Sequence, residues 1–92
     1  MAILSDNEID RALQSLPGWA RGTGQISKEF KFGGFPEAVA FVGRMVEPAE
    51  TANHHPDLEI HYNRVVVALA THSEGGVTAK DTDLAAAIEQ LA

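Results

Sequence analysis

The chain has 92 residues, of which 45% are hydrophobic and 22% charged, a composition typical of one small soluble domain. Thirteen acidic residues against seven basic ones give a net charge of −6, which argues against a nucleic-acid backbone as a partner. There is no cysteine, so a disulfide framework and a thiolate metal site are both excluded. Because no apolar run approaches the roughly 20 residues of a membrane span and no signal peptide is visible, we expect a single cytoplasmic domain over residues 1–92.

The first third of the chain predicts a helix followed by two strands. Ser5 and Glu8 have the spacing of a capping box, and apolar residues at helical spacing follow it until Pro17. Trp19 then opens a short strand. Residues 25–32 alternate between apolar and polar side chains, which predicts a second strand.

A second helix is predicted from Pro36 towards Asn53, with Pro48 inside its apolar pattern. Proline removes one amide and crowds the carbonyl four residues earlier, so we expect a kink or a restart there. Pro56 biases His55 away from the helical conformation, which should end the helix near the histidine pair.

The last third predicts two strands and a helix. The strands are expected over Leu58–Tyr62 and Val65–Thr71, with Asn63 in the turn between them, and Thr78 with Asp81 has the capping-box spacing that opens the last helix. The predicted order is α-β-β-α-β-β-α. This order favours an α+β fold, with a four-stranded antiparallel sheet and about three helices packed on one face.

Histidines and carboxylates gather in the second half of the chain, and imidazole exchanges protons near neutral pH. Glu50 and His54 are four residues apart, so on a helix the carboxylate can orient the imidazole; the alternative is a solvated pair at a helix end. The neighbours His54 and His55 also raise a zinc site with His72 as a third ligand. Adjacent helical residues point about 100° apart, however, which disfavours zinc.

The remaining polar candidates have structural as well as functional interpretations. His72 ends a strand beside small residues, where it is either a structural histidine or part of a site for a flat ligand. Asp81 is either only the capping partner of Thr78 or a member of the site. His61 fits no pattern, and we expect a solvated strand residue.

Five motifs follow one another along the chain: Ala52-Asn53-His54-His55-Pro56-Asp57, Tyr62-Asn63-Arg64-Val65, Thr71-His72, Gly75-Gly76, and Asp81 with Leu84-Ala85. Together they resemble the pterin-4a-carbinolamine dehydratase family, and the resemblance covers essentially the whole chain. One position departs from the family pattern, because Leu58 stands where an aromatic residue, typically Trp, is usual.

The resemblance implies an enzyme of tetrahydrobiopterin recycling. Family members eliminate water from 4a-hydroxytetrahydrobiopterin to give quinonoid dihydropterin, with no metal and no organic cofactor. Carried over by position, His54 and His72 are the acid/base pair and His55 mainly binds the substrate. The resemblance gives a binding or supporting role to Glu50, Asn53 and Asp81. Of these, Glu50 would orient His54, and Asp81 would tune His72 or the pterin ring.

The resemblance also leaves an alternative open. Some relatives bind transcription factors as dimerisation cofactors, and others are proposed to act near molybdopterin metabolism, so a weakly active or non-catalytic pterin-binding or protein-interaction module is the second hypothesis. A homodimer or homotetramer is expected from the family. The segment 65–70 is apolar on both faces, which predicts cover by helices or by another subunit. We expect neither nucleic acid nor a membrane as a partner.

Overall fold

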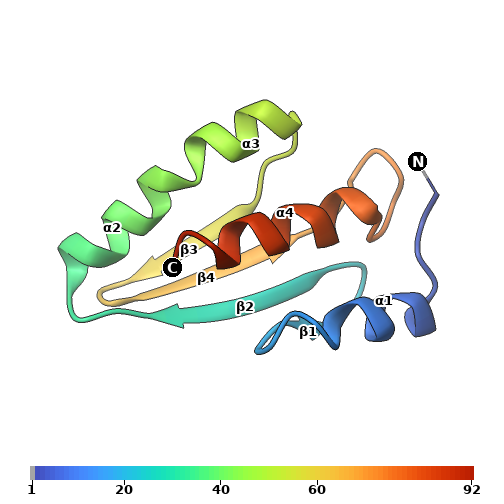
Figure 1. Ribbon diagram of the computed structural model, residues 1–92, viewed down its shortest axis with the longest axis horizontal. Helices are drawn as coiled ribbons and strands as arrows, with labels where there is room; N and C mark the ends of the chain where they lie inside the picture. Colours follow the sequence, from blue (N-terminus) through green and yellow to red (C-terminus); the bar gives the residue numbers. More distant parts are fainter. Residues whose placement is uncertain (1) are drawn as a thin grey trace.

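The computed structural model describes residues 2–92 and shows helices packed on one face of a four-stranded antiparallel sheet (Figure 1). This confirms the predicted α+β fold and its element order, except that the second helix is divided in two. The elements are α1 (Asp6–Leu13), β1 (Ala20–Arg21), β2 (Ile26–Lys31), α2 (Phe35–Arg44), α3 (Val46–Ala52), β3 (Asp57–His61), β4 (Arg64–Leu69) and α4 (Ala79–Glu89). No helix within residues 2–92 is both long enough and apolar enough to cross a membrane.

The strands lie in the order β1-β2-β4-β3, so β4 is paired on both sides and β3 is an edge strand. The register of β3 and β4 places Asp57 opposite Ala68 and His61 opposite Arg64. The start of β3 and the end of β4 therefore meet at one end of the sheet. Beyond that end, Thr71 forms an isolated bridge with Gly76, so β4 starts one residue before the predicted strand and ends two residues before its predicted end.

The core lies between the sheet and the helices. Its strand members are Ile26, Phe30, Val65, Val67 and Leu69, and the helices contribute Ile9, Ala38, Phe41, Leu84, Ala85 and Ile88. Burial of this apolar surface is the main force that holds the two layers together. On the opposite face of β4, Val66 and Ala68 are only half-buried, so one chain covers just one face of the apolar segment 65–70.

The expected helix break is confirmed, and it lies at Met45. Pro48 has no amide to bond to the carbonyl of Arg44, where α2 ends. Regular helical bonding resumes with the Ala49 amide, which donates to the carbonyl of Met45 at 3.0 Å. As a result, α2 and α3 follow each other along the β3 side of the sheet. α4 lies over the sheet, roughly along the direction of β4 (Figure 1).

Asn53 ends α3 in the left-handed conformation, with φ 49° and ψ 45°. Asparagine adopts this conformation more readily than other non-glycine residues. The next amide, that of His54, turns back and donates to the carbonyl of Ala49 at 3.0 Å. The chain therefore leaves the helix before His54, which points the histidine pair towards the end of the sheet.

Candidate functional site

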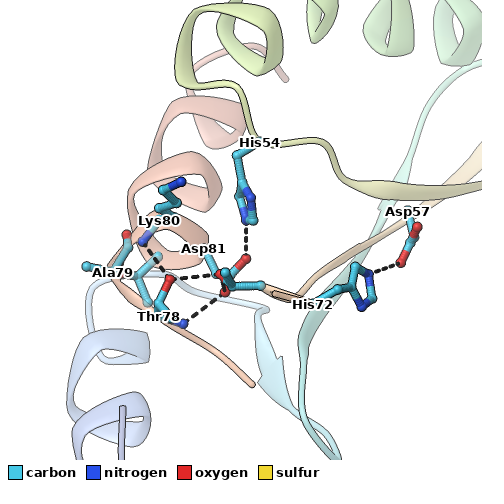
Figure 2. Close-up of polar contacts among 9 residues, drawn as sticks. His54, Asp57, His72, Thr78, Ala79, Lys80 and Asp81 are labelled. Atoms are coloured by element: carbon cyan, nitrogen blue, oxygen red, sulfur yellow. Dashed lines mark hydrogen bonds and ion pairs between the residues drawn. The ribbon is translucent and has the colours of Figure 1, made fainter. Parts of the chain in front are cut away.

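Three segments meet at the end of the sheet where β3 begins and β4 ends: the loop after α3, the turn after β4, and the first turn of α4 (Figure 2). The first segment carries His54 and His55, the second carries Thr71 and His72, and the third carries Asp81. Residues that are up to 27 positions apart in the chain thus lie around one site. All three histidines named by the sequence motifs are in this region.

His54 is paired with Asp81. Its Nε2 lies 2.5 Å from Asp81 Oδ1, and both residues are buried, with 9% and 0% of their surface exposed. The other carboxylate oxygen of Asp81 accepts the Thr78 amide at 2.9 Å and the Thr71 hydroxyl at 2.8 Å. Asp81 is therefore both the capping partner of α4 and the carboxylate that contacts His54.

This pairing fixes the proton of His54. An ionised carboxylate only accepts hydrogen bonds, so the imidazole proton belongs on Nε2 and the lone pair of the neutral ring lies on Nδ1. Nδ1 of His54 has no hydrogen-bond partner among residues 2–92, whereas every buried side-chain nitrogen or oxygen atom in that range has one. Nδ1 is therefore not one of the buried atoms. It is open to solvent, and a ligand at the site can exchange a proton with it.

His55 is paired with Glu50, with 2.5 Å between Nε2 and Oε2, and both side chains are exposed. The sequence pattern predicts that the carboxylate of Glu50 orients the imidazole of His54, and this prediction is wrong. It assumed that the helix continues through His54 with spacing i,i+4. The left-handed Asn53 ends α3 one residue earlier, which brings His55 to Glu50 and turns His54 towards α4.

His72 lies beside Asp57, with 3.7 Å between Nε2 and Oδ2, and both side chains are exposed (Figure 2). The family resemblance implied that Asp81 tunes His72 or the pterin ring, whereas in the structure Asp81 contacts His54 and not His72. The sequence interpretation did not assign Asp57 to the site at all. A signal was available, because an antiparallel hairpin brings the first residue of β3 to the end of β4, close to His72.

An open pocket of about 340 Å³ lies among these groups. Its lining includes Asn53, His54, His55, Thr71, His72 and Lys80. Lys80, also absent from the sequence interpretation, adds a cation beside the histidines. His61 is exposed near the far end of β3 and bonds to Glu59 at 3.0 Å, as expected for a solvated residue apart from the site.

Two other hollows adjoin the helices. One of about 230 Å³ is lined by Glu50, His55, Pro56 and Leu58 together with apolar side chains of α2 and α3, so His55 borders both it and the histidine pocket. A broader groove of about 820 Å³ runs between α2–α3 and the end of α4, past Arg44 and Leu91. That groove holds no histidine, so we assign the proton chemistry to the smaller histidine pocket.

Comparison with known proteins identifies a family. The family model described as pterin 4 alpha carbinolamine dehydratase matches residues 2–91. A protein of Picosynechococcus sp. whose name assigns it to pterin-4-alpha-carbinolamine dehydratase is 51% identical over 96% of each chain, and one of Nocardia farcinica with the same name is 48% identical over 98% of this chain and 95% of its own.

Solved structures agree with this match. The crystal structure of a transcriptional coactivator/pterin dehydratase from Brucella melitensis superposes with a TM-score of 0.94, at 40% identity over 99% of both chains. A pterin dehydratase-like protein, described as a RuBisCO assembly factor in the alpha-carboxysome, has a TM-score of 0.65 at 19% identity, covering 79% of this chain and 84% of its own. The second likeness shows the shared fold only.

Proposed function

Because the chain belongs to the pterin 4 alpha carbinolamine dehydratase family, we propose that it eliminates water from 4a-hydroxytetrahydrobiopterin to give quinonoid dihydropterin. The observation that carries this proposal is the pocket lined by three histidines, each of which has its own carboxylate partner. The product is the oxidised pterin that a reductase returns to the tetrahydro form, so the protein would serve tetrahydrobiopterin recycling.

The reaction breaks the bond between C4a and its hydroxyl group and removes a proton from a ring nitrogen. It needs an acid that protonates the departing hydroxyl, a base that accepts the nitrogen proton, and stabilisation of the positive charge that develops between these steps. A positioned acid or base typically contributes about 10²–10⁴-fold in rate. Two histidines in opposite protonation states meet both needs near neutral pH.

We assign the acid/base pair to His54 and His72. Asp81 holds the ring of His54 through Nε2, while Nδ1 stays open for proton exchange. His72, exposed beside Asp57, would act from the rim of the pocket. The carboxylates Asp81 and Asp57 also place negative charge near the developing cation.

We assign substrate binding to His55, together with Glu50 and Asn53. His55 borders both the histidine pocket and the apolar hollow at Leu58, so a flat ring could lie across it. Glu50 fixes the orientation of His55. Leu58 offers less contact to such a ring than the aromatic residue usual in the family, and we infer weaker packing of the pterin there.

The proposed chemistry requires neither a metal nor an organic cofactor. Micromolar protein should therefore accelerate the decay of enzymatically generated 4a-hydroxytetrahydropterin over buffer, and EDTA should leave the rate unchanged. Absorbance measurements of quinonoid dihydropterin formation, with and without the chelator, test this. A rate equal to that of buffer would exclude the dehydratase proposal, and loss of the rate on chelation would restore a metal mechanism.

We also propose that the protein is a homodimer or homotetramer. β3 is an edge strand, and unpaired strand edges favour association. β3 itself exposes Leu58 and Ile60, and the neighbouring helices α2 and α3 expose Val39 and Val46. Light scattering at micromolar concentration should report two or four times the 9.9 kDa chain mass. A monodisperse 9.9 kDa species would refute this proposal.

The same exposed apolar surface favours the second candidate function, a protein-interaction module. The relative from Brucella melitensis is described as a transcriptional coactivator as well as a pterin dehydratase. If this function is the main one, the chain should bind a stable dihydropterin or a protein partner without accelerating carbinolamine decay. Parallel binding and rate measurements on the same preparation distinguish the two functions.

A further inference from the structure

We propose that Thr71 is a positioning residue for His54, which it holds in its reactive orientation by acting through Asp81. This inference rests on the proposed dehydratase function for its kinetic consequences. The hydrogen-bond geometry that supports it is independent of that function. Thr71 lies one residue before His72 and donates to Asp81, the partner of His54, so it is linked to both histidines assigned to proton transfer.

The carboxylate of Asp81 is held on both sides. Oδ1 faces the ring of His54, and Oδ2 accepts the Thr71 hydroxyl at 2.8 Å and the Thr78 amide at 2.9 Å. Thr71, Thr78 and Asp81 are 5%, 0% and 0% exposed, so water does not compete for these bonds. Hydrogen bonds to a buried charged group are among the strongest in proteins.

Each threonine hydroxyl has a single proton, and this determines which group donates and which accepts in the hydrogen bonds around Asp81. The proton of the Thr71 hydroxyl goes to Asp81. The hydroxyl oxygens of Thr71 and Thr78 are 2.8 Å apart, so Thr78 must donate to Thr71. Thr78 Oγ1 in turn accepts the Lys80 amide at 3.2 Å. Every donor in this series of hydrogen bonds therefore points towards the carboxylate of Asp81, and each bond strengthens the next.

Thr71 differs from Thr78 in having no capping role. Thr78 is the N-cap of α4, so its replacement would disturb the helix as well as the site. The described hydroxyl contacts of Thr71 go only to Asp81 and Thr78, while its backbone bonds to Gly76 and Gly75 hold the turn that carries His72. Replacing the side chain alone can therefore remove the donor to Asp81 and leave the backbone of the turn bonded.

The consequence for His54 follows from the geometry. Without the Thr71 hydroxyl, one oxygen of Asp81 keeps only the Thr78 amide, so the carboxylate can rotate about its side-chain bonds. The bond to His54 Nε2 then becomes less directional. A ring that is less firmly held also populates the other tautomer, in which Nδ1 carries the proton and the lone pair points towards Asp81.

The test compares Thr71→Val, which keeps the shape of the side chain, with Thr71→Ser, which keeps the hydroxyl. Thr71→Ala is a second variant without the hydroxyl, for use if valine distorts the turn. The matched control is Thr82→Val, because the hydroxyl of Thr82 also donates a hydrogen bond, at 3.2 Å to the Ala79 carbonyl, but that bond does not involve the carboxylate of Asp81. Circular dichroism establishes that each variant is folded.

Two measurements are made on each variant: the ¹⁵N spectrum of the His54 imidazole, which reports its tautomer, and kcat with KM for carbinolamine dehydration. We expect Thr71→Val and Thr71→Ala to increase the Nδ1–H tautomer and to lower kcat about tenfold with KM within about twofold, the change typical of one lost hydrogen bond to a charged group. Thr71→Ser and Thr82→Val should resemble the wild type in both measurements.

The proposal is overturned if Thr71→Val and Thr71→Ala leave the tautomer of His54 unchanged. It is also overturned if Thr71→Ser is as impaired as Thr71→Val, because that result would assign a packing role to the missing methyl group. An inactive wild-type protein would end the dehydratase proposal instead, and the tautomer spectra would still decide the role of Thr71.

Discussion

His54→Ala is expected to lower kcat for carbinolamine dehydration by about a hundredfold, the lower part of the range for a positioned general acid or base. His54 is the histidine held most firmly, since it is buried against Asp81 while Nδ1 remains open. Alanine removes the proton-transfer group and leaves the backbone of the loop. Steady-state kinetics should show most of the effect in kcat, because the ring acts on the reacting atoms.

Two further histidine variants make this prediction specific. His72→Ala should lower kcat by at least about tenfold, because it removes the second proton-transfer group of the pocket. His61→Ala should leave kcat within about twofold of the wild type, because His61 contacts Glu59 away from the pocket. An effect of His61→Ala equal to that of His54→Ala would show that the site is wrongly placed.

Asp81→Ala is expected to have the largest effect on folding, with the free energy of unfolding reduced by about 3–5 kcal/mol, because three buried donors lose their acceptor and each such loss costs about 1–3 kcal/mol. Asp81 is fully buried and accepts bonds from the His54 ring, the Thr71 hydroxyl and the Thr78 amide. Its removal leaves all three partners buried without an acceptor and also deletes the capping box of α4. Urea denaturation measures the change.

Asp83→Ala is the matched control. Asp83 is also an aspartate of α4, but it is exposed to solvent, so its replacement should change the free energy of unfolding by less than about 0.5 kcal/mol. A loss for Asp81→Ala no larger than that for Asp83→Ala would contradict the buried network. Asp81→Asn keeps the volume of the side chain but adds donors that face other donors, so it should remain clearly destabilised.

The fold could be predicted from the sequence because its signals are local. The capping boxes at Ser5 and Thr78 mark where α1 and α4 begin, and the alternation of residues 25–32 specifies which face of β2 is buried. Pro48 likewise indicated an interruption of the second helix. The position of the break at Met45 follows from the same residue, because the amide that Pro48 lacks would have bonded to the carbonyl of Arg44, four residues earlier.

The site was only partly predictable. The three histidines stood out by residue type and spacing, and they do border one pocket. Their carboxylate partners were assigned wrongly, because distance along the chain was taken for distance in space. The left-handed Asn53 turns His54 away from Glu50, and the register of β3 and β4 brings Asp57 near His72. Neither effect follows from helical periodicity.

The buried hydroxyls show a further limit of sequence patterns. Thr71 and Thr78 are ordinary residues at a strand end and a helix cap, and nothing in their spacing connects them to His54. Their connection arises only when the turn after β4 packs against the start of α4, which places both hydroxyls next to Asp81. Hydrogen-bond partners of this kind are identified from the three-dimensional structure and not from sequence spacing.

The most direct test of this account is the rate at which 4a-hydroxytetrahydropterin is lost in the presence of the wild-type protein or of the His54→Ala/His72→Ala double variant. Both proteins should be folded, and both should be assayed at the same micromolar concentration. We predict that the wild type accelerates the loss and that the double variant returns it to the rate in buffer. A wild-type rate no faster than buffer, or a double variant as fast as the wild type, would contradict the account.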